Sequence, residues 1–210
     1  MKIHIRYIAF SLIILLSACE PNLETEGISR ITNFPIITLK GEQWNQIPVG
    51  GTFTDPGGTA LEGSTPLDVK VTGSVNPAVA GVYTITYEAV NKDDYPAKAY
   101  RYVGVIAPAV SGVDITGSYK RNAGALGVST VTKISGNLFF ADNVGGIATP
   151  TPSVGVYFYF YDTGKLGVPF QLTPGNSFEC TDATINVGVS YSWVVVNSGY
   201  GAALRTFVKL

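Results

Sequence analysis

Apolar and polar side chains alternate along most of the chain after residue 34, and this period of two is typical of half-buried β-strands. In segment 82–90, tyrosine, isoleucine and alanine occupy every second position, with threonine and glutamate at most of the positions between them. Segment 67–72 alternates in the same way, with leucine and two valines on one face. A further strand is predicted over 97–107. Because no apolar stripe of helical period appears, and glycine and proline recur, the pattern predicts an all-β protein.

A short segment containing proline and glycine, residues 108–112, divides this pattern, and we interpret it as a linker between domains 32–107 and 113–210. Each side carries enough predicted strands for a core of its own. The strands predicted in the second domain are 117–121, 128–134, 137–141, 154–161, 168–172, 184–189, 190–196 and 202–209. This number of short strands fits either an antiparallel β-sandwich or a barrel-like domain.

The N-terminal residues have the features of a bacterial export signal. Two basic residues precede an apolar run over 8–16, and small residues lie directly before Cys19. The run is too short to span a bilayer comfortably, which favours a cleaved signal peptide, 1–18, over a transmembrane helix. The Leu-Ser-Ala-Cys sequence resembles the lipobox of bacterial lipoproteins, which implies that Cys19 is lipidated. Residues 19–31 are polar and acidic and are predicted to form a flexible tether.

Removal of the signal peptide takes away Lys2 and Arg6 and changes the formal net charge from −1 to −3. A negative chain of this kind argues against nucleic-acid binding. The only histidine, His4, is also lost, so the mature chain has no Ser-His or Cys-His catalytic arrangement and no zinc site that uses histidine. Since Cys19 is taken by the lipid, Cys180 has no disulfide partner in the chain, and we interpret it as a small buried hydrophobic residue.

The first domain carries motifs in a recognisable order. Phe-Thr-Asp-Pro-Gly begins at Phe53, and Gly-Val-Tyr-Thr-Ile-Thr-Tyr begins at Gly81. Domain 32–107 resembles the bacterial immunoglobulin-like domains of surface proteins, including the type appended to insecticidal crystal proteins. The resemblance implies a β-sandwich, in which Tyr83 is placed to form a tyrosine-corner hydrogen bond. The fold class is therefore predicted as an immunoglobulin-like β-sandwich followed by a second antiparallel β-sandwich or barrel-like domain.

The order of lipobox, acidic tether, immunoglobulin-like domain and second β domain resembles a family of Bacteroidetes surface lipoproteins. Many members of that group occur beside starch-utilisation-type glycan uptake systems. The resemblance implies an exported protein, anchored by its lipid in the outer membrane and exposed at the cell surface. Polysaccharides or oligosaccharides and neighbouring surface proteins are the partners that it suggests.

Segment 156–161 is the most unusual strand, because aromatic residues fill all but its first position. Phe158 and Phe160 fall on one face, which we assign to the core. Tyr157, Tyr159 and Tyr161 fall on the other face. That face is either an exposed platform on which sugar rings stack, or it covers the second side of a sheet or lines a barrel.

Trp44 lies in a polar segment between predicted strands. It is either an exposed recognition anchor or a cap that folds onto the end of the sandwich. Trp193 alternates with other large apolar residues and is predicted to lie in the core. Trp44 therefore joins the three tyrosines as a candidate ligand-binding residue.

The acidic residues do not predict a metal site or a catalytic pair. Calcium requires six to eight oxygen ligands, and the neighbourhoods of Asp55 and Asp93-Asp94 lack the necessary density of acidic residues. In the second domain, no spacing singles out a glycosidase pair among Asp142, Asp162, Glu179 and Asp182. No metal and no cofactor is predicted.

These observations predict a non-catalytic surface lipoprotein that binds glycans or assists glycan uptake. The first domain then serves as a spacer, and the second faces the ligand. Two alternatives remain open at this point. One is a structural or adhesion module that binds a protein partner, and the other is an accessory unit of a hydrolase. An exposed aromatic strip would favour glycan, and a flat apolar patch would favour a protein.

Overall fold

The structure, a computed structural model, describes residues 31–210. Strands form throughout this part of the chain, as the alternation of apolar and polar residues predicts. The signal peptide, Cys19 and nearly all of the tether lie outside the described residues. Within them there is no α-helix, and consequently no helix that is long and apolar enough to cross a membrane. Phe34–Leu210 form one compact unit.

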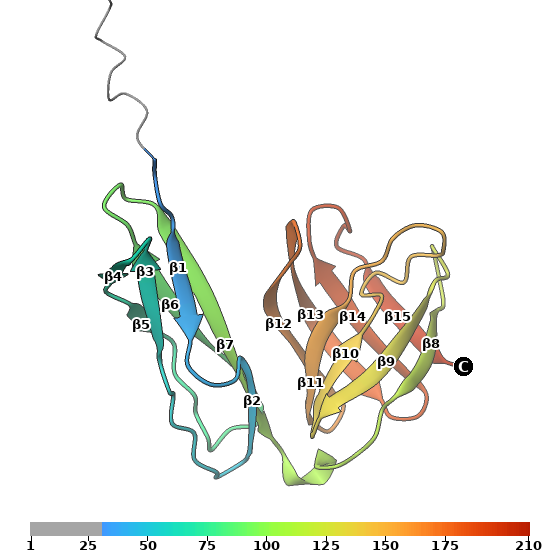
Figure 1. Ribbon diagram of the computed structural model, residues 1–210. Coiled ribbons are helices and arrows are strands. Elements are labelled where there is room, and N and C mark those ends of the chain that lie inside the picture. Colours follow the sequence, from blue (N-terminus) through green and yellow to red (C-terminus); the bar gives the residue numbers. More distant parts are fainter. Residues whose placement is uncertain (1–30) are drawn as a thin grey trace, which may run out of the picture. The chain divides into compact units, whose positions relative to one another are not determined.

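The first part of this unit consists of two sheets that enclose a shared core, which we call the sandwich (Figure 1). One sheet has the strand order β1-β3-β4, and the other has the order β2-β7-β6-β5, in which β2 runs parallel to β7. The strands are β1 (Pro35–Leu39), β2 (Trp44–Pro48), β3 (Gly58–Glu62), β4 (Thr65–Leu67), β5 (Lys70–Thr72), β6 (Gly81–Val90) and β7 (Pro96–Ile106).

Strand β6 follows the predicted alternation closely. Ile85, Tyr87 and Ala89 are buried, and the residues between them are more accessible. The Tyr83 hydroxyl donates a hydrogen bond to the Val79 carbonyl oxygen at 2.9 Å. This is the contact to upstream backbone that the tyrosine-corner analogy predicts.

The prediction of one strand over 67–72 is wrong. The chain leaves the first sheet after Leu67 and enters the second sheet at Lys70, so this segment is divided between β4 and β5. Val71 is 48% exposed and therefore does not share a buried face with Leu67. The sequence does alternate here. Because the chain passes from one sheet to the other at Asp68–Val69, however, the apolar residues on either side do not share one face.

The second part is a closed barrel of eight antiparallel strands, which decides between the two predicted architectures (Figure 1). Its order is β10-β11-β12-β13-β14-β15-β8-β9. The strands are β8 (Gly117–Arg121), β9 (Val128–Ser135), β10 (Leu138–Ala141), β11 (Val156–Asp162), β12 (Lys165–Thr173), β13 (Asn176–Asn186), β14 (Ser190–Val196) and β15 (Leu204–Lys209).

Aromatic side chains fill the barrel. Phe158 packs against Phe139 and Trp193, with ring centroids 5.9 and 5.7 Å apart, and Tyr191 stacks on Phe207 at 4.7 Å. All five are almost completely buried. An eight-stranded barrel has an interior just wide enough for side chains, so this interior is a packed core. The predicted core positions of Phe158, Phe160 and Trp193 are confirmed, as is the burial of Cys180.

Strand β13 is longer than predicted, since pairing begins at Asn176 and not at Thr184. Its register shifts between Thr181 and Thr184, where Asp182 adopts a positive φ of 52°. Such a bulge changes which face the side chains occupy. The first half, in which Phe178 and Cys180 are buried at alternate positions, is thereby separated from the half that begins at Thr184.

The predicted linker is a short 3₁₀ turn, Pro108–Val110, held by the barrel. The Asn137 side-chain amide donates to the carbonyl oxygens of Val110 and Phe160, both at 2.9 Å, and its oxygen accepts from the Gly112 N–H at 3.2 Å. The Ala107 N–H also donates to the Tyr161 carbonyl oxygen, at 2.8 Å. That domains 32–107 and 113–210 fold independently stays a prediction.

Candidate functional site

The tyrosine face of β11 lies against the sandwich, where Tyr159 is completely buried. Its ring lies on Gly104 of β7, and its hydroxyl donates to the Asn45 carbonyl oxygen at 2.7 Å. Burial raises the pKa of Tyr159 above its usual value. The expectation of an exposed three-tyrosine platform is therefore wrong at its central residue, because the sandwich covers that residue.

Three glycines allow this close approach of the sandwich and the barrel. A Cβ atom on Gly104 would lie 2.6 Å from the Tyr159 ring, and one on Gly167 would lie 2.3 Å from Val82. Gly136 leaves space for the Gln46 side chain, whose oxygen accepts from the Asn137 N–H at 2.8 Å. The Tyr102 hydroxyl adds a hydrogen bond of 2.5 Å to the Phe170 carbonyl oxygen. The contact is thus both closely packed and hydrogen-bonded.

Tyr157 and Trp44 meet at the edge of this contact and remain partly accessible. The Trp44 ring lies 4.2 Å from that of Tyr102, 5.1 Å from that of Tyr157 and 6.0 Å from that of Tyr159, measured between centroids. Trp44 is thus neither a free loop anchor nor a cap on the end of the sandwich. It is the first residue of β2 and forms part of an aromatic cluster shared with the barrel.

Tyr161 does not join this cluster. It lines a separate groove with Val82, Tyr100 and Phe170, and Tyr100 also reaches the cleft described next. Of the four candidate residues, the structure therefore brings Trp44 and Tyr157 together at an accessible surface, buries Tyr159 beneath them and places Tyr161 at a different opening.

Trp44 and Tyr157 line a cleft of about 650 Å³. Aromatic side chains that the sequence did not single out complete it, namely Tyr100, Tyr102 and Phe140. Phe140 lies over Gly155, where a Cβ atom would be only 2.1 Å from the ring. The remaining lining residues are Gln43, Lys98, Ala99, Ser153, Val154, Gly155, Gln171, Leu172, Thr173 and Pro174. Tyr100 and Phe140 belonged to predicted strands, but nothing in the pattern indicated that they face the same opening.

The polar groups of the cleft are few and mostly uncharged. The Gln171 side chain is buried and is bonded to the N–H and carbonyl of Tyr157, both at 2.8 Å. The exposed Gln43 donates through Nε2 to the Tyr100 carbonyl oxygen at 3.1 Å. Among residues 31–210, Lys98 is the one charged residue that lines the cleft, and its Nζ lies 3.1 Å from Glu88 Oε2. Flat aromatic surfaces therefore dominate, with amide and hydroxyl groups at the rim.

None of the four carboxylates considered for catalysis lines this cleft. Asp142 accepts a hydrogen bond from the Thr130 N–H at 2.7 Å. Asp162 pairs with Lys165 at 3.1 Å, and this partner is the main reason that its pKa lies below the usual value. Glu179 lines the groove that Tyr161 occupies. The cleft thus has the side chains of a binding surface and lacks a pair of acidic residues.

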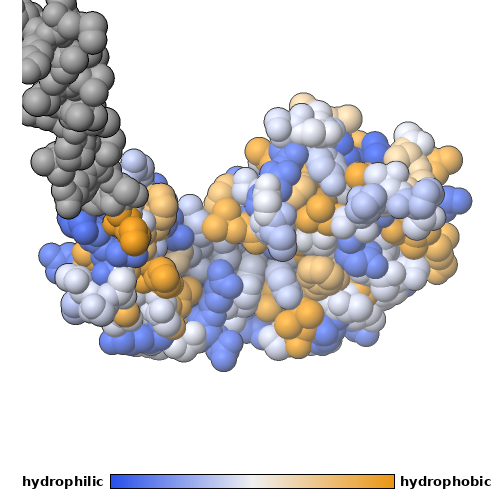
Figure 2. Space-filling model, turned by 45° about the horizontal axis from the view of Figure 1, so that its top comes forward, coloured by the Kyte–Doolittle hydropathy of each residue, from blue (hydrophilic) through white to orange (hydrophobic). Residues whose placement is uncertain are grey.

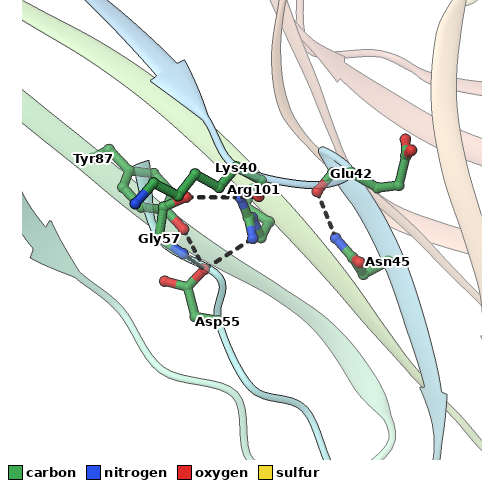
Figure 3. Close-up of polar contacts among 7 residues, drawn as sticks. All are labelled: Lys40, Glu42, Asn45, Asp55, Gly57, Tyr87 and Arg101. Atoms are coloured by element: carbon green, nitrogen blue, oxygen red, sulfur yellow. Dashed lines mark hydrogen bonds and ion pairs between the residues drawn. The ribbon is translucent and has the colours of Figure 1, made fainter. Parts of the chain in front are cut away.

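Asp55, considered above for calcium, has a different partner in the sandwich core (Figure 3). Its Oδ1 lies 3.0 Å from Arg101 Nη1 and accepts a hydrogen bond from the Tyr87 hydroxyl at 2.5 Å. Arg101 is completely buried and also donates to the carbonyl oxygens of Lys40 and Gly57. Asp55 therefore neutralises a buried cation. Over residues 31–210, no cluster of acidic, cysteine or histidine side chains has the composition of a metal site.

In a comparison with known proteins, the family model described as bacterial surface protein, Ig-like domain, matches residues 37–105. The match covers about a third of the chain and confirms the predicted immunoglobulin-like fold of the sandwich. A search of curated proteins finds no match. Among solved structures, the lipoprotein BT2262 from Bacteroides thetaiotaomicron is 19% identical, with a TM-score of 0.38, and the match covers 84% of this chain and 100% of that one.

Proposed function

We propose that this protein is a lipid-anchored protein of the bacterial cell surface that binds an oligosaccharide, without cleaving it, in the cleft beside Trp44 and Tyr157. The observation that carries the proposal is the aromatic lining of the cleft. Sugar rings present apolar C–H faces that pack on aromatic rings, and they present hydroxyl groups that bond to amides and hydroxyls. Trp44, Tyr100 and Tyr157 supply the aromatic rings, and Gln43 and Ser153 supply the amide and hydroxyl groups.

The size and rigidity of the cleft support this proposal. Its volume lies within the range of about 300–1,000 Å³ that is typical of small-ligand sites. Trp44 and Tyr157 are held by the ring cluster behind them, so little side-chain entropy remains to be lost on binding. Because Lys98, the charged residue that lines the cleft, is already paired, we expect a neutral glycan and little dependence of affinity on salt.

Calorimetry on soluble residues 20–210 with a panel of neutral polysaccharides tests the proposal. Tyr157→Ala removes a stacking surface, and Ser153→Trp fills the cleft from an exposed position without removing any packing. Each is expected to weaken binding by at least about tenfold, which corresponds to 1.4 kcal/mol. Tyr95→Ala, at an exposed tyrosine elsewhere on the sandwich, is the matched control and should leave affinity unchanged. Equal affinity in wild type and both cleft variants, each shown by melting to be folded, would refute the assignment.

The surface location is supported by the order of residues before Cys19 and by the family match of segment 37–105. Metabolic labelling with an alkyne fatty acid tests the anchor. Wild type should be labelled and should fractionate with the outer membrane, whereas Cys19→Ser should lose the label. Equal labelling of the two proteins would contradict lipidation at Cys19.

A further inference from the structure

Four large apolar side chains lie exposed together at one end of the sandwich, and we call them the terminal patch. They are Phe34, Ile36, Leu61 and Tyr95, with exposed fractions of 61, 67, 43 and 49%. The Phe34 and Tyr95 rings form an edge contact at 5.2 Å, and Ile36 pairs with Leu61 across β1 and β3. Figure 2 shows apolar surface, in orange, on the sandwich.

The terminal patch is unusual because apolar residues occupy outward-facing positions of β1 and β3. Pro35, Ala60 and Glu62 point inward, so Ile36 and Leu61 occupy the outward positions, where polar residues are usual. Thr38 and Thr59, farther along the same two strands, follow the usual rule. Single exposed apolar residues are ordinary, but a contiguous group indicates a surface that is covered in the working protein.

Glu62, a buried acidic residue beside the patch, is paired with Lys92. Glu62 is buried next to Pro35 in the sheet, and its Oε1 lies 3.1 Å from Lys92 Nζ. The carboxylate also accepts from the Lys92 N–H at 3.1 Å. The Glu62 carboxylate therefore adds no uncompensated charge to the patch.

We propose that the terminal patch rests on the lipid bilayer to which Cys19 anchors the protein. This inference depends on the proposed lipid anchor. Phe34 follows Cys19 by fifteen residues, which span at most about 54 Å when fully extended. The anchor therefore keeps the patch near the membrane and makes its contact with the bilayer intramolecular, so that a weak contact becomes populated.

The composition and size of the patch favour a bilayer over a protein partner. Aromatic and branched apolar side chains are those that lie at membrane interfaces. A stable protein interface needs about 20–30 residues on each side, whereas the patch has four protruding residues. A small apolar contact is sufficient beside a covalent lipid anchor, because the anchor makes the contact with the bilayer intramolecular.

The test uses residues 19–210 with Cys19 coupled to a maleimide phospholipid in phosphatidylcholine vesicles that carry brominated acyl chains. Cys180 is buried, and burial raises the pKa of its thiol, so the coupling is selective for Cys19. Tryptophan is introduced by Phe34→Trp at the patch or, as the matched control, by Leu172→Trp at a barrel position that is 63% exposed. The parent protein supplies the background emission of Trp44 and Trp193.

The Phe34→Trp emission is expected to shift to the blue and to lose most of its intensity to bromine, while the Leu172→Trp emission stays unchanged. Adding Ile36→Asp and Leu61→Asp should abolish both effects. Absence of quenching at position 34, equal quenching at both positions, or shielding of position 34 by self-association before vesicles are added would overturn the inference. Because the anchor is attached chemically, failure here is distinguishable from failure of lipidation in cells, which the labelling of Cys19 reports.

Discussion

Arg101 is the residue whose environment most constrains the sandwich. It is a completely buried cation with one carboxylate partner, Asp55, and two backbone carbonyl partners. The guanidinium also lies 5.6 Å from the centroid of the Tyr87 ring. A buried charge is tolerated only when it is paired and hydrogen-bonded, so the cluster depends on each of its members.

Asp55→Asn is expected to lower the free energy of unfolding by about 3 kcal/mol, because it leaves Arg101 buried without a counter-charge. Urea denaturation measures the loss. Asp68→Asn, the same change at an exposed position of the sandwich, is the control and should alter stability by less than about 0.5 kcal/mol. If the two variants proved equally stable, Asp55 would not be the required partner.

Three buried tyrosines predict a loss of stability at alkaline pH. Burial raises the pKa values of Tyr102, Tyr159 and Tyr191 in the folded protein. Below the unfolded pKa of about 10, both states hold these protons and the contribution to stability is complete. Above it, the unfolded state ionises first, so stability falls as pH rises towards the folded pKa values. Phenolate absorbance from these residues should therefore appear together with loss of β-sheet circular dichroism. Their ionisation in a fully folded protein would contradict the prediction.

At the scale of elements, alternation identifies strands reliably where one face is buried and the strand stays in one sheet. Strand β7 departs from this condition, since all residues from Arg101 to Ile106 are buried. One face packs on the sandwich core, and the other includes Gly104, which receives the Tyr159 ring. A strand covered on both faces loses the polar half of its pattern. The nearly continuous apolar run of β7 therefore indicates that the strand is covered on both faces, by the sandwich core and by the barrel.

The linker turn depends on Asn137, which is 3% exposed. Asn137→Ala removes hydrogen bonds to Val110, Gly112 and Phe160 and leaves buried backbone groups unpaired. We expect a loss of about 2–3 kcal/mol and faster proteolytic cleavage within 107–113. Limited proteolysis followed by mass spectrometry measures the cleavage, and the exposed Asn186→Ala is the control. Cleavage at the wild-type rate would show that the turn is held by other contacts.

At the scale of the whole molecule, the proposed cleft depends on the contact between sandwich and barrel. Gly104→Val should displace the Tyr159 ring and with it Trp44, because even a Cβ atom would lie 2.6 Å from that ring. We expect a loss of about 1–3 kcal/mol, the usual effect of overpacking, together with weaker glycan binding.

Differential scanning calorimetry and fluorescence of Trp44 measure this effect. Gly199→Ala is the control, since a Cβ atom there would meet only ordinary van der Waals contact at 3.4 Å. An unchanged melting transition and unchanged Trp44 emission in Gly104→Val would show that the contact adapts to the larger side chain.

The fold class, most strands and the core positions of Phe158, Phe160 and Trp193 could be predicted from the sequence alone. These features are local, because each depends on the period of apolar residues within one strand or on turn residues between strands. The motifs beginning at Phe53 and Gly81 added the immunoglobulin-like fold, which the family match confirms.

The closure of the second part into a barrel and the burial of Tyr159 become visible only in three dimensions. Closure depends on pairing between distant strands, and a period-two pattern is the same in a sandwich and in a barrel. Tyr157, Tyr159 and Tyr161 have equivalent sequence surroundings, yet one is buried and two face different openings. The difference in burial among the three tyrosines depends on Gly104 and Gly167. Because these residues have no side chains, the sandwich can pack closely against the barrel.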